Sequence, residues 1–297
     1  MKTFVKAERK KSKLRLGLTG PSGSGKTYGA LLIALGIGGK IAVIDTEKGS
    51  ASLYTHISDF DVLELEAPYS PESFIEAIIA AESAGYDTLI IDSITHEWSG
   101  KGGCLEINEA VAQSKYRGNT WSAWNETTAR HRAFLDRMMQ SKMHVIVTIR
   151  SKTETAQQDS ITGKKQVVKL GMKAEQRDGI EFELTTVLDI IHDGHYAVAS
   201  KDRTGLFTDK DPKAITVETG KSLLDWLNSG AEPKPEPIIE PITEQPKTVT
   251  DWINEINATE SVAHLNATCQ MIPKELRKSV NDARIEKLNE LSKQEVA

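Results

Sequence analysis

The sequence is poor in cysteine. Its 297 residues include two cysteines, Cys104 and Cys269, which lie far apart and belong to no CxxC or CxxH pair. This pattern argues against a disulfide framework and against a structural zinc site. We therefore expect a protein of a reducing cytoplasm in which both cysteines are ordinary small side chains.

Long hydrophobic runs are also missing. No uncharged apolar stretch approaches the length of about 18 residues that indicates a membrane-spanning helix, so no membrane association is expected. The first fifteen residues carry seven Lys or Arg side chains and one acid. Glycines, Pro21 and Lys26 soon interrupt the apolar stretch that follows, and this is not the pattern of a signal peptide.

Neither sign of charge dominates the composition. The formal net charge is −5, with 27% charged and 39% hydrophobic residues, which argues against wholesale disorder, a collagen-like repeat or a coiled-coil rod. Residues 232–297 hold twelve acids and eight bases, whereas residues 1–13 form a basic arm. The acidic total therefore does not exclude a nucleic-acid partner.

Residues 14–230 alternate short apolar runs with longer amphipathic stretches. This pattern predicts one α/β domain with a mainly parallel central sheet flanked by helices. The expected strands are 14–19, 41–45, 88–92, 144–149, 184–191 and 196–200. One helix is expected to begin after Lys26, and the others are expected at 71–84, 105–113, 123–140 and 220–228. Ser70 is expected to cap the helix 71–84.

The composition changes after residue 230. Residues 231–249 include five prolines and predict a semi-extended linker. Helical periodicity returns in 250–297, where we expect a small helical hairpin or bundle whose second helix starts at Pro273. A unit of this size has little stability of its own, so a partner is expected to support it.

A glycine-rich segment follows the first expected strand. GPSGSGKT at 20–27 fits the phosphate-binding pattern GxxxxGK[ST], and a helix is expected to begin near its lysine. Small residues let the backbone wrap around a phosphate chain, and the helix N-terminus adds positive potential. Lys26 is predicted to neutralise the β and γ phosphates, and the Thr27 hydroxyl to ligate Mg²⁺. The predicted nucleotide-binding residues are Gly20, Pro21, Ser22, Gly23, Ser24, Gly25, Lys26, Thr27 and Tyr28.

Two further expected strands end in carboxylates. Asp92 follows a continuous apolar run and is predicted to bind Mg²⁺ directly or through water. Asp45 ends the strand 41–45 and Glu47 follows it, at the edge of an α/β sheet where ligands bind. Glu47 is a candidate base for an attacking water, and a surface or helix-capping role is equally open on these residues alone.

Taken together, these motifs resemble the RecA-like ATPase core of RecA, RadA and DnaB-type helicases. They also resemble, more closely still, small phage-encoded AAA-family ATPases of the Sak-type single-strand annealing and recombination group. The segments that carry the similarity are GPSGSGKTYGALLIA, IAVIDTEKGSASLY, LIIDSITHEW, VIVTIRSKTE, QRDGIEFE and ASKDRTGLF, within residues 12–230. The resemblance implies a RecA-like P-loop ATPase that uses ATP and Mg²⁺ and works as a homo-oligomeric ring or filament in the host cytoplasm.

The resemblance also implies roles for individual residues. Glu47 in IDTE matches the catalytic glutamate of RecA, and Asp92 matches the metal-binding aspartate of the second Walker motif. Arg150 follows the expected strand 144–149, at the place where RecA carries a γ-phosphate-sensing glutamine, so it is a candidate sensor or an ordinary ion-pair partner at a strand end. Lys201 and Arg203 resemble the basic element that reaches the neighbouring subunit's nucleotide, with a solvated β-turn as the alternative.

A lysine-rich stretch, 151–177, follows the fourth expected strand, where RecA has a DNA-binding loop. Lysines there would contact phosphates of a single strand, although the stretch contains no aromatic residue for base stacking. A surface hairpin with solvated charges is the alternative, and the basic arm is a second candidate. The candidate DNA contacts are Lys152, Lys164, Lys165, Lys169 and Lys173.

Other conspicuous side chains have plainer interpretations. Trp98, Trp121 and Trp124 are expected to be packing residues, with base stacking as the alternative. His96 and His131 have no partners at metal-ligand spacing, so no metal site besides Mg²⁺ is expected.

Three functions remain open from the sequence. The first is an ATP-hydrolysing protein that acts on single-stranded DNA in recombination, annealing or replication, with a phage single-strand-binding or recombination protein as a further partner. The second is a nucleotide-switched adaptor or loader for such a partner, and the third is a P-loop kinase of a small metabolite. A water activator at Glu47 and the lack of an arginine-rich lid argue against the kinase. The lack of an NKxD motif argues against a GTPase.

Overall fold

The computed structural model describes residue 4 and residues 6–159, 165–231 and 247–294, and it gives the backbone alone for 153–159 and 165–172. The described residues fall into two compact units, one ending at Ala231 and one beginning at Lys247. Most of the predicted linker 231–249 therefore lies outside the described residues, as do residues 1–3 and 5 of the basic arm.

The first unit contains nine described strands and seven α-helices. The strands are β1 Arg15–Gly20, β2 Ile41–Asp45, β3 Asp61–Glu64, β4 Thr88–Asp92, β5 His144–Asp159, β6 Lys165–Ala174, β7 Thr186–Ile190, β8 Tyr196–Asp202 and β9 Lys213–Ala214. The helices are α1 Lys26–Ile37, α2 Pro71–Ser83, α3 Thr95–Ser99, α4 Cys104–Lys115, α5 Thr120–Gln140, α6 Ile180–Glu183 and α7 Val217–Asn228. Two short 3-10 turns, η1 Ala51–Tyr54 and η2 Asp193–His195, complete the set.

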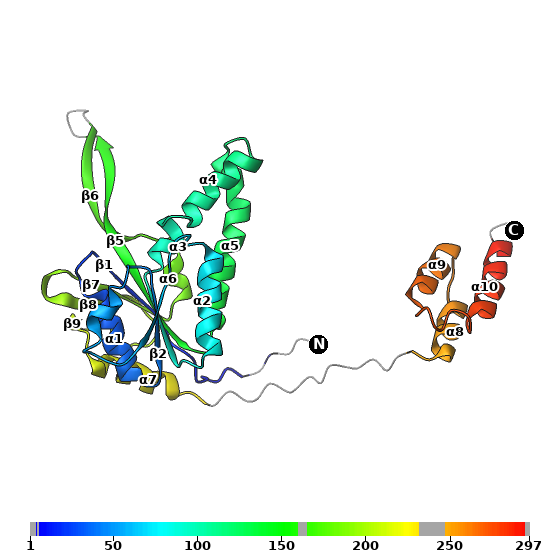
Figure 1. The fold of residues 1–297 in the computed structure, drawn as a ribbon, viewed down its shortest axis with the longest axis horizontal. Helices are drawn as coiled ribbons and strands as arrows, with labels where there is room; N and C mark the ends of the chain where they lie inside the picture. The colour runs from blue at the N-terminus through cyan, green and yellow to red at the C-terminus, as the bar shows by residue number, and fades with distance from the viewer. Residues whose placement is uncertain (1–3, 5, 160–164, 232–246, 295–297) are drawn as a thin grey trace. The chain divides into compact units, whose positions relative to one another are not determined.

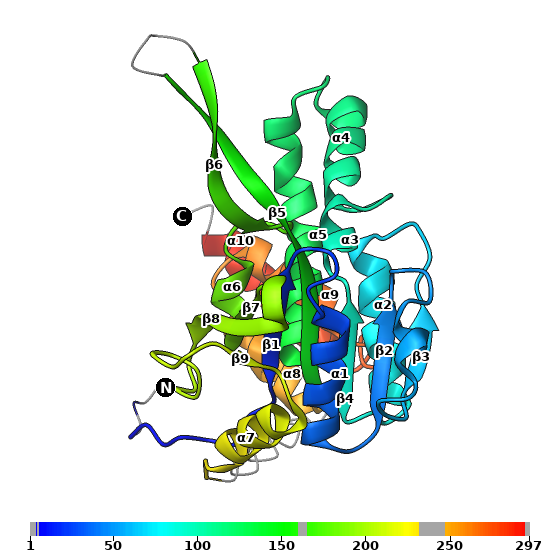
Figure 2. The same cartoon turned by 90° about the vertical axis from the view of Figure 1, so that its left-hand side faces the viewer.

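The strands form one sheet in the order β3-β2-β4-β5-β1-β7-β8-β9, with β6 paired to β5 (Figures 1 and 2). The pairs from β3 to β7 are parallel, and β8 and β9 continue antiparallel. Every residue of β1, β2 and β4 is buried, as expected for parallel strands covered on both faces. The predicted fold class, a mainly parallel α/β sheet flanked by helices, is confirmed.

Helices cover both faces of this sheet. Alternate residues of a strand point to opposite faces, so Ile44 of β2 joins one core and Val43 joins the other. The first core includes Phe74 of α2 and Phe134 of α5, whose ring centroids lie 5.5 Å apart. The second core contains α1 and α7. The sheet is thus packed between two layers of helices, one on each face.

The helix α2 begins as its sequence predicts. The Ser70 hydroxyl accepts a hydrogen bond from the Ser73 amide at 3.2 Å, and Pro71 occupies the first turn. The strand β3 was not expected, because it is short, lies at the sheet edge and has mostly exposed side chains.

The fourth predicted strand is much longer than 144–149. β5 continues to Asp159 and pairs with β6 in antiparallel register, from Ser151 opposite Ala174 to Asp159 opposite Lys165. This β5–β6 hairpin and the α4–α5 helix pair both extend beyond the same edge of the sheet (Figures 1 and 2). That edge is the one at which β5 leaves the sheet.

Arg15 does not belong with the basic arm. Its side chain is only 7% exposed, and its guanidinium donates hydrogen bonds to the carbonyl oxygens of Met139 at 2.9 Å and Met143 at 2.8 Å. Burial lowers its pKa to about 10, against the raising effect of Glu82. This charge ties the start of β1 to the turn between α5 and β5.

The second unit is a three-helix bundle made of α8 Val249–Asn257, α9 Val262–Met271 and α10 Asn281–Gln294. Its core includes Trp252 and Leu265. The prediction that Pro273 starts a helix is wrong. Bonds from the Leu276 amide to the Pro273 carbonyl and from Ser279 to Leu276 close three-residue turns instead. No helix in the described part of the chain is long and apolar enough to cross a membrane.

Candidate active site

The glycine-rich loop connects the end of β1 at Gly20 to the start of α1 at Lys26. A Cβ atom at Gly20 would lie 2.5 Å from the Ser24 hydroxyl and 2.8 Å from the Ile190 carbonyl, so no larger residue fits. Gly25 caps α1 in the left-handed region at φ 92°, which favours glycine. The loop therefore has the tight backbone wrap that a phosphate-binding loop requires.

Lys26 lies against this loop. Its ammonium donates hydrogen bonds to the carbonyl oxygens of Gly20 at 3.0 Å and Pro21 at 2.8 Å. Burial lowers its pKa and Arg150 lowers it further, while Asp92 and Glu47 raise it. The lysine is thus held beside the same acidic groups that the sequence assigned to the site.

Thr27 and Asp92 are in direct contact. The Thr27 hydroxyl donates to one carboxylate oxygen of Asp92 at 2.5 Å, and Thr148 of β5 donates to the other at 2.5 Å. Asp92 is 2% exposed, and burial raises its pKa while the two hydroxyls lower it. Hydroxyl and carboxylate oxygens are the ligands that Mg²⁺ prefers, so the residues present fit this ion.

Glu47 makes a two-pronged ion pair with Arg150. The guanidinium Nε and Nη2 donate to the two carboxylate oxygens at 2.7 and 2.5 Å. Burial raises the pKa of Glu47, but the hydrogen bonds and charge of Arg150, with His96 and Lys26, outweigh burial and hold the pKa below its usual value. Arg150 is therefore an ion-pair partner of the candidate base, a possibility the sequence had left open.

Asp45 has a structural place in the site. Its two carboxylate oxygens accept hydrogen bonds from the backbone amides of Glu47 at 2.6 Å and Ala51 at 3.0 Å. These bonds fix the loop that carries Glu47 above the end of β2. Of the two carboxylates at this strand end, Glu47 is the one whose side chain points to the basic residues of the site.

Arg150 also stands at the base of the β5–β6 hairpin. It pairs with Gly20 of β1 in the sheet, and the next residue, Ser151, already pairs with β6. Its amide donates to the Thr95 hydroxyl at 2.9 Å, and its carbonyl accepts from the Glu175 amide at 2.7 Å. The residue that holds Glu47 is thus continuous with the strand that leaves the sheet.

Lys201 and Arg203 lie near the amino ends of the parallel strands, whereas the glycine-rich loop lies at their carboxyl ends. Asp202 pairs with Thr186, which pairs with Leu16 near the start of β1, whereas the glycine-rich loop follows the end of β1. Lys201 donates to the Glu181 and Phe182 carbonyl oxygens at 2.5 and 2.8 Å, and Arg203 to the Phe182 carbonyl at 3.2 Å. The structure does not bring these two residues together with Lys26 and Glu47.

Two histidines that sequence reasoning missed lie against the glycine-rich loop. The His195 Nδ1 donates to the Ser24 carbonyl at 2.9 Å. A Cβ atom at Gly23 would lie 3.6 Å from His192 Nε2. Both belong to the turn between β7 and β8, and only the pairing of β7 with β1 brings that turn to the loop.

Four of the five candidate DNA lysines lie on the β5–β6 hairpin. Lys152 is exposed and pairs with Glu175 at 3.5 Å, and Lys173 pairs with Asp178 at 2.9 Å. Lys165 and Lys169 are residues of β6, opposite Asp159 and Thr155. Lys164 lies outside the described residues.

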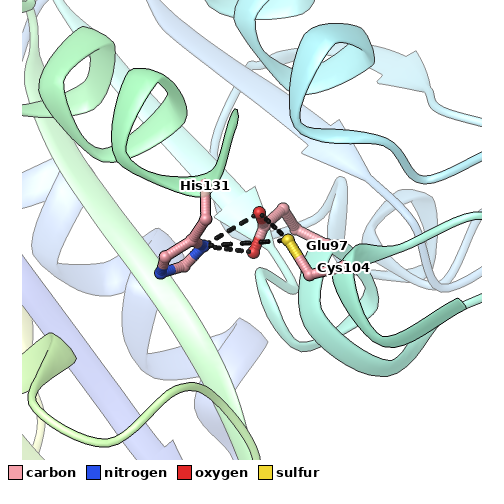
Figure 3. A group of neighbouring side chains, drawn as sticks. All are labelled: Glu97, Cys104 and His131. Carbon is pink, nitrogen blue, oxygen red and sulfur yellow. Dashed lines mark hydrogen bonds and ion pairs between the residues drawn. The ribbon is translucent and has the colours of Figure 1, made fainter. Parts of the chain in front are cut away.

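His131 has two close partners, contrary to the expectation from spacing. Its Nδ1 lies 3.0 and 3.2 Å from the Glu97 carboxylate oxygens, and the Cys104 thiol donates to the same carboxylate at 3.0 Å (Figure 3). All three side chains are buried, and burial together with Glu97 raises the pKa of Cys104 far above its usual value. These side-chain types also bind metals, but here a protonated thiol and hydrogen bonds account for each contact.

A cavity lies beside the glycine-rich loop. It has a volume of about 770 Å³, touches the loop at Gly20 and Pro21, and has apolar walls from β7 and α6. Lys26 and Thr27 do not line it. The cavity therefore adjoins the loop without including the two side chains predicted to contact phosphate and Mg²⁺.

The site belongs to a recognisable class. A strand, a GxxxxGKT loop and a helix in that order, with acidic groups at the ends of two neighbouring parallel strands, define a P-loop nucleoside-triphosphatase core. A family model described as an AAA domain matches residues 12–224, and the chain belongs to this family of nucleotide-binding ATPases. Among curated proteins, no relative matches this chain.

Proposed function

We propose that this protein is a Mg²⁺-dependent ATPase that acts as a homo-oligomer on single-stranded DNA, in the host cytoplasm, as one of the phage Sak-type annealing and recombination proteins that its motifs resemble. One observation carries the ATPase assignment. Thr27 contacts Asp92 at 2.5 Å at the sheet edge that also holds Lys26 and the Glu47–Arg150 pair. The residues proposed to bind phosphate, to hold Mg²⁺ and to activate water therefore lie next to one another.

The chain's own groups divide the work of hydrolysis. The loop amides and Lys26 bind the β and γ phosphates, and Thr27 and Asp92 hold Mg²⁺. Bound Mg²⁺ supplies positive charge against the phosphate oxygens. Glu47 orients a water for attack on the γ phosphorus and takes its proton as the bond from that phosphorus to the bridging oxygen breaks. In the nucleotide-free chain, Arg150 keeps Glu47 ionised and so ready to accept this proton.

Arg150 is also suited to report the nucleotide state. Its guanidinium is partly exposed beside Glu47, where a γ phosphate would compete for its hydrogen bonds. Because Arg150 is the last residue of β5 before the hairpin, a change in its partners would be felt at the hairpin base. This is the route by which nucleotide would alter the grip on DNA.

The position of Lys201 and Arg203 favours the proposed homo-oligomer. They lie at the sheet edge opposite the glycine-rich loop, so they have no access to the phosphates of their own chain. An arginine delivered by a neighbouring subunit stabilises charge on the transferring phosphate. We assign Arg203, with Lys201, to this role.

A nucleotide-switched loader is the second candidate function. The three-helix unit α8–α10 has its own small core and is a suitable docking module for a recombination or replication protein. Such a loader would hydrolyse ATP without any response to DNA.

ATP turnover with and without oligothymidine separates these functions. We expect single-stranded DNA to stimulate phosphate release, and Lys26→Ala to abolish it. Turnover that ignores DNA but responds to a recombination or single-strand-binding protein would favour the loader. Phosphate transferred to a metabolite instead of water would favour a kinase.

A further inference from the structure

A groove with aromatic and cationic walls lies between α3, α5 and the segment that follows β6. Its volume is about 540 Å³, and its walls include Trp98, Trp121, Trp124, Arg132 and Arg177. Among the described residues that line it, none is a carboxylate. The groove lies outside the nucleotide site and plays no part in the proposed hydrolysis.

The α5 contribution is a single stripe of the helix. Trp121, Trp124, Thr128 and Arg132 follow one another at spacings of three and four residues, so they share one face. The opposite face, with Ala123 and Phe134, is buried in the core. Trp121 is 86% exposed, so the expectation that it packs in the interior is wrong. Packing among the described residues does not explain why a tryptophan stands at this exposed position.

The other two tryptophans form the floor of the groove. The rings of Trp98 and Trp124 stack with centroids 5.5 Å apart and an angle of 17° between them. The Arg177 guanidinium lies over the Trp124 ring at 5.7 Å and donates to the Thr128 hydroxyl at 3.1 Å. Aromatic faces with guanidinium groups at their margin match a nucleobase and its phosphates.

Buried ring contacts and hydrogen bonds fix the elements that carry Trp98, Trp124 and Arg177. His131 packs edge-on against Trp98 at 5.6 Å and is bound to the buried Glu97, which fixes α3 to α5 (Figure 3). Gln176 donates to the Ile94 carbonyl at 2.9 Å and to Glu97 at 3.4 Å, which places the neighbouring Arg177. A binding surface built on fixed elements needs little ordering when a ligand arrives.

The groove is continuous with the base of the β5–β6 hairpin. An adjoining depression shares Trp98 and Arg177 with it and also includes Lys152 and Lys173. A strand that contacts the hairpin lysines would therefore reach the tryptophans by following one surface. The β5–β6 hairpin and the α4–α5 helix pair extend beyond the same side of the sheet (Figure 1).

We propose that Trp98, Trp121, Trp124, Arg132 and Arg177 form a base-stacking site for single-stranded DNA. Bases stack on the exposed face of Trp121 beside the Trp98–Trp124 pair, and Arg132 and Arg177 neutralise the flanking phosphates. The proposal rests on the proposed action on single-stranded DNA and names a contact surface for it. It supplies the stacking aromatics that the hairpin sequence lacks.

The test is the affinity of the full chain for a fluorescently labelled thymidine 20-mer, measured by anisotropy. We expect Trp121→Ala to weaken binding about fivefold or more, because a stacked base contributes about 1–3 kcal/mol. Trp121→Phe should retain most of the affinity, and Arg132→Ala should weaken binding and its salt dependence. Lys40→Ala, at the amino edge of the sheet, is the matched control and should bind like the wild type. Unchanged Mg-ATP binding shows that each variant is folded.

An abasic 20-mer separates stacking from charge. The wild type should bind it more weakly than the thymidine strand, and Trp121→Ala should cause no further loss on it. Equal losses on both strands would overturn the stacking role. Wild-type affinity in Trp121→Ala and Arg132→Ala, with loss in Lys152→Ala, would remove this groove but leave the proposed function standing. A wild type that hydrolyses ATP and binds neither strand would overturn both.

Discussion

At the scale of single residues, the site depends on the pair between Glu47 and Arg150. Burial alone would raise the pKa of Glu47 and so favour its protonated form. The two hydrogen bonds from Arg150 outweigh burial and keep the carboxylate ionised. Because the folded pKa is lowered, the stability that the pair contributes is present above the usual pKa of glutamate and is lost as pH falls through the lowered one.

Replacing Arg150 should therefore shift the pH dependence of turnover. In Arg150→Met, burial remains while the lowering contribution of the guanidinium is gone, so the acid limb of kcat/KM should move to higher pH. Arg150→Lys keeps a positive charge and should move the limb less. A limb that stays in place in Arg150→Met, whatever the loss of rate, would show that Arg150 does not set the ionisation of the base.

The two cysteines should differ in reactivity. Cys104 is buried, and burial together with Glu97 raises its pKa far above the usual range, whereas Cys269 is partly exposed. We expect a thiol reagent at pH 8 to label one cysteine per folded chain and two after denaturation, and Cys269→Ser to remove the fast one. Fast labelling of the folded Cys269→Ser chain would contradict the hydrogen-bonded network around Glu97.

At the scale of elements, the two helices on one face of the sheet cross at a pair of glycines. A Cβ atom at Gly36 of α1 would lie 2.1 Å from the Val217 carbonyl of α7, and one at Gly220 of α7 would lie 2.2 Å from the Ile33 carbonyl. The backbones themselves are in contact there. This crossing holds α1, and with it the loop that ends at Lys26, against the sheet.

Gly36→Ala should destabilise the first unit by about 3 kcal/mol, because backbone atoms have to move apart to admit the methyl group. Gly29→Ala in the same helix is the control. Its Cβ would meet the end of the Ile215 side chain at 3.0 Å, which can give way. Thermal unfolding followed by circular dichroism checks both, and equal midpoints would contradict the tight crossing.

Elements with a strong local signal could be predicted from the sequence. β1, β2 and β4 are continuous apolar runs, and the glycine-rich loop needs only its own residues and its neighbours. β6 has no such signal, since it pairs with β5 alone beyond the body of the sheet. Its extent depends on contacts that no local pattern records.

Contacts between distant segments could not be predicted in the same way. The Glu47–Arg150 pair, the turn of His192 and His195 on the glycine-rich loop, and the Glu97–His131 contact all depend on strand order and helix placement. For the same reason, the sequence alone did not show that Arg203 lies at the far edge of the sheet.

At the scale of the whole molecule, the role proposed for Arg203 would make assembly part of catalysis, because Arg203 is separated from its own glycine-rich loop. We expect Arg203→Ala to bind nucleotide normally but to lose turnover, while Lys210→Ala, an exposed neighbour, keeps it. Mixing Arg203→Ala with Lys26→Ala chains should restore part of the activity, because one chain supplies an intact loop and the other an intact arginine. Normal turnover by Arg203→Ala alone would remove it from this role.

The most direct test of the central claim is calorimetric titration of the folded chain with Mg-ATP. The loop that begins at Gly20 should bind one nucleotide per chain, Mg²⁺ should strengthen binding through Thr27 and Asp92, and Lys26→Ala should abolish it. A well-folded wild-type chain that takes up no Mg-ATP, or a Lys26→Ala chain that takes it up equally well, would contradict the account.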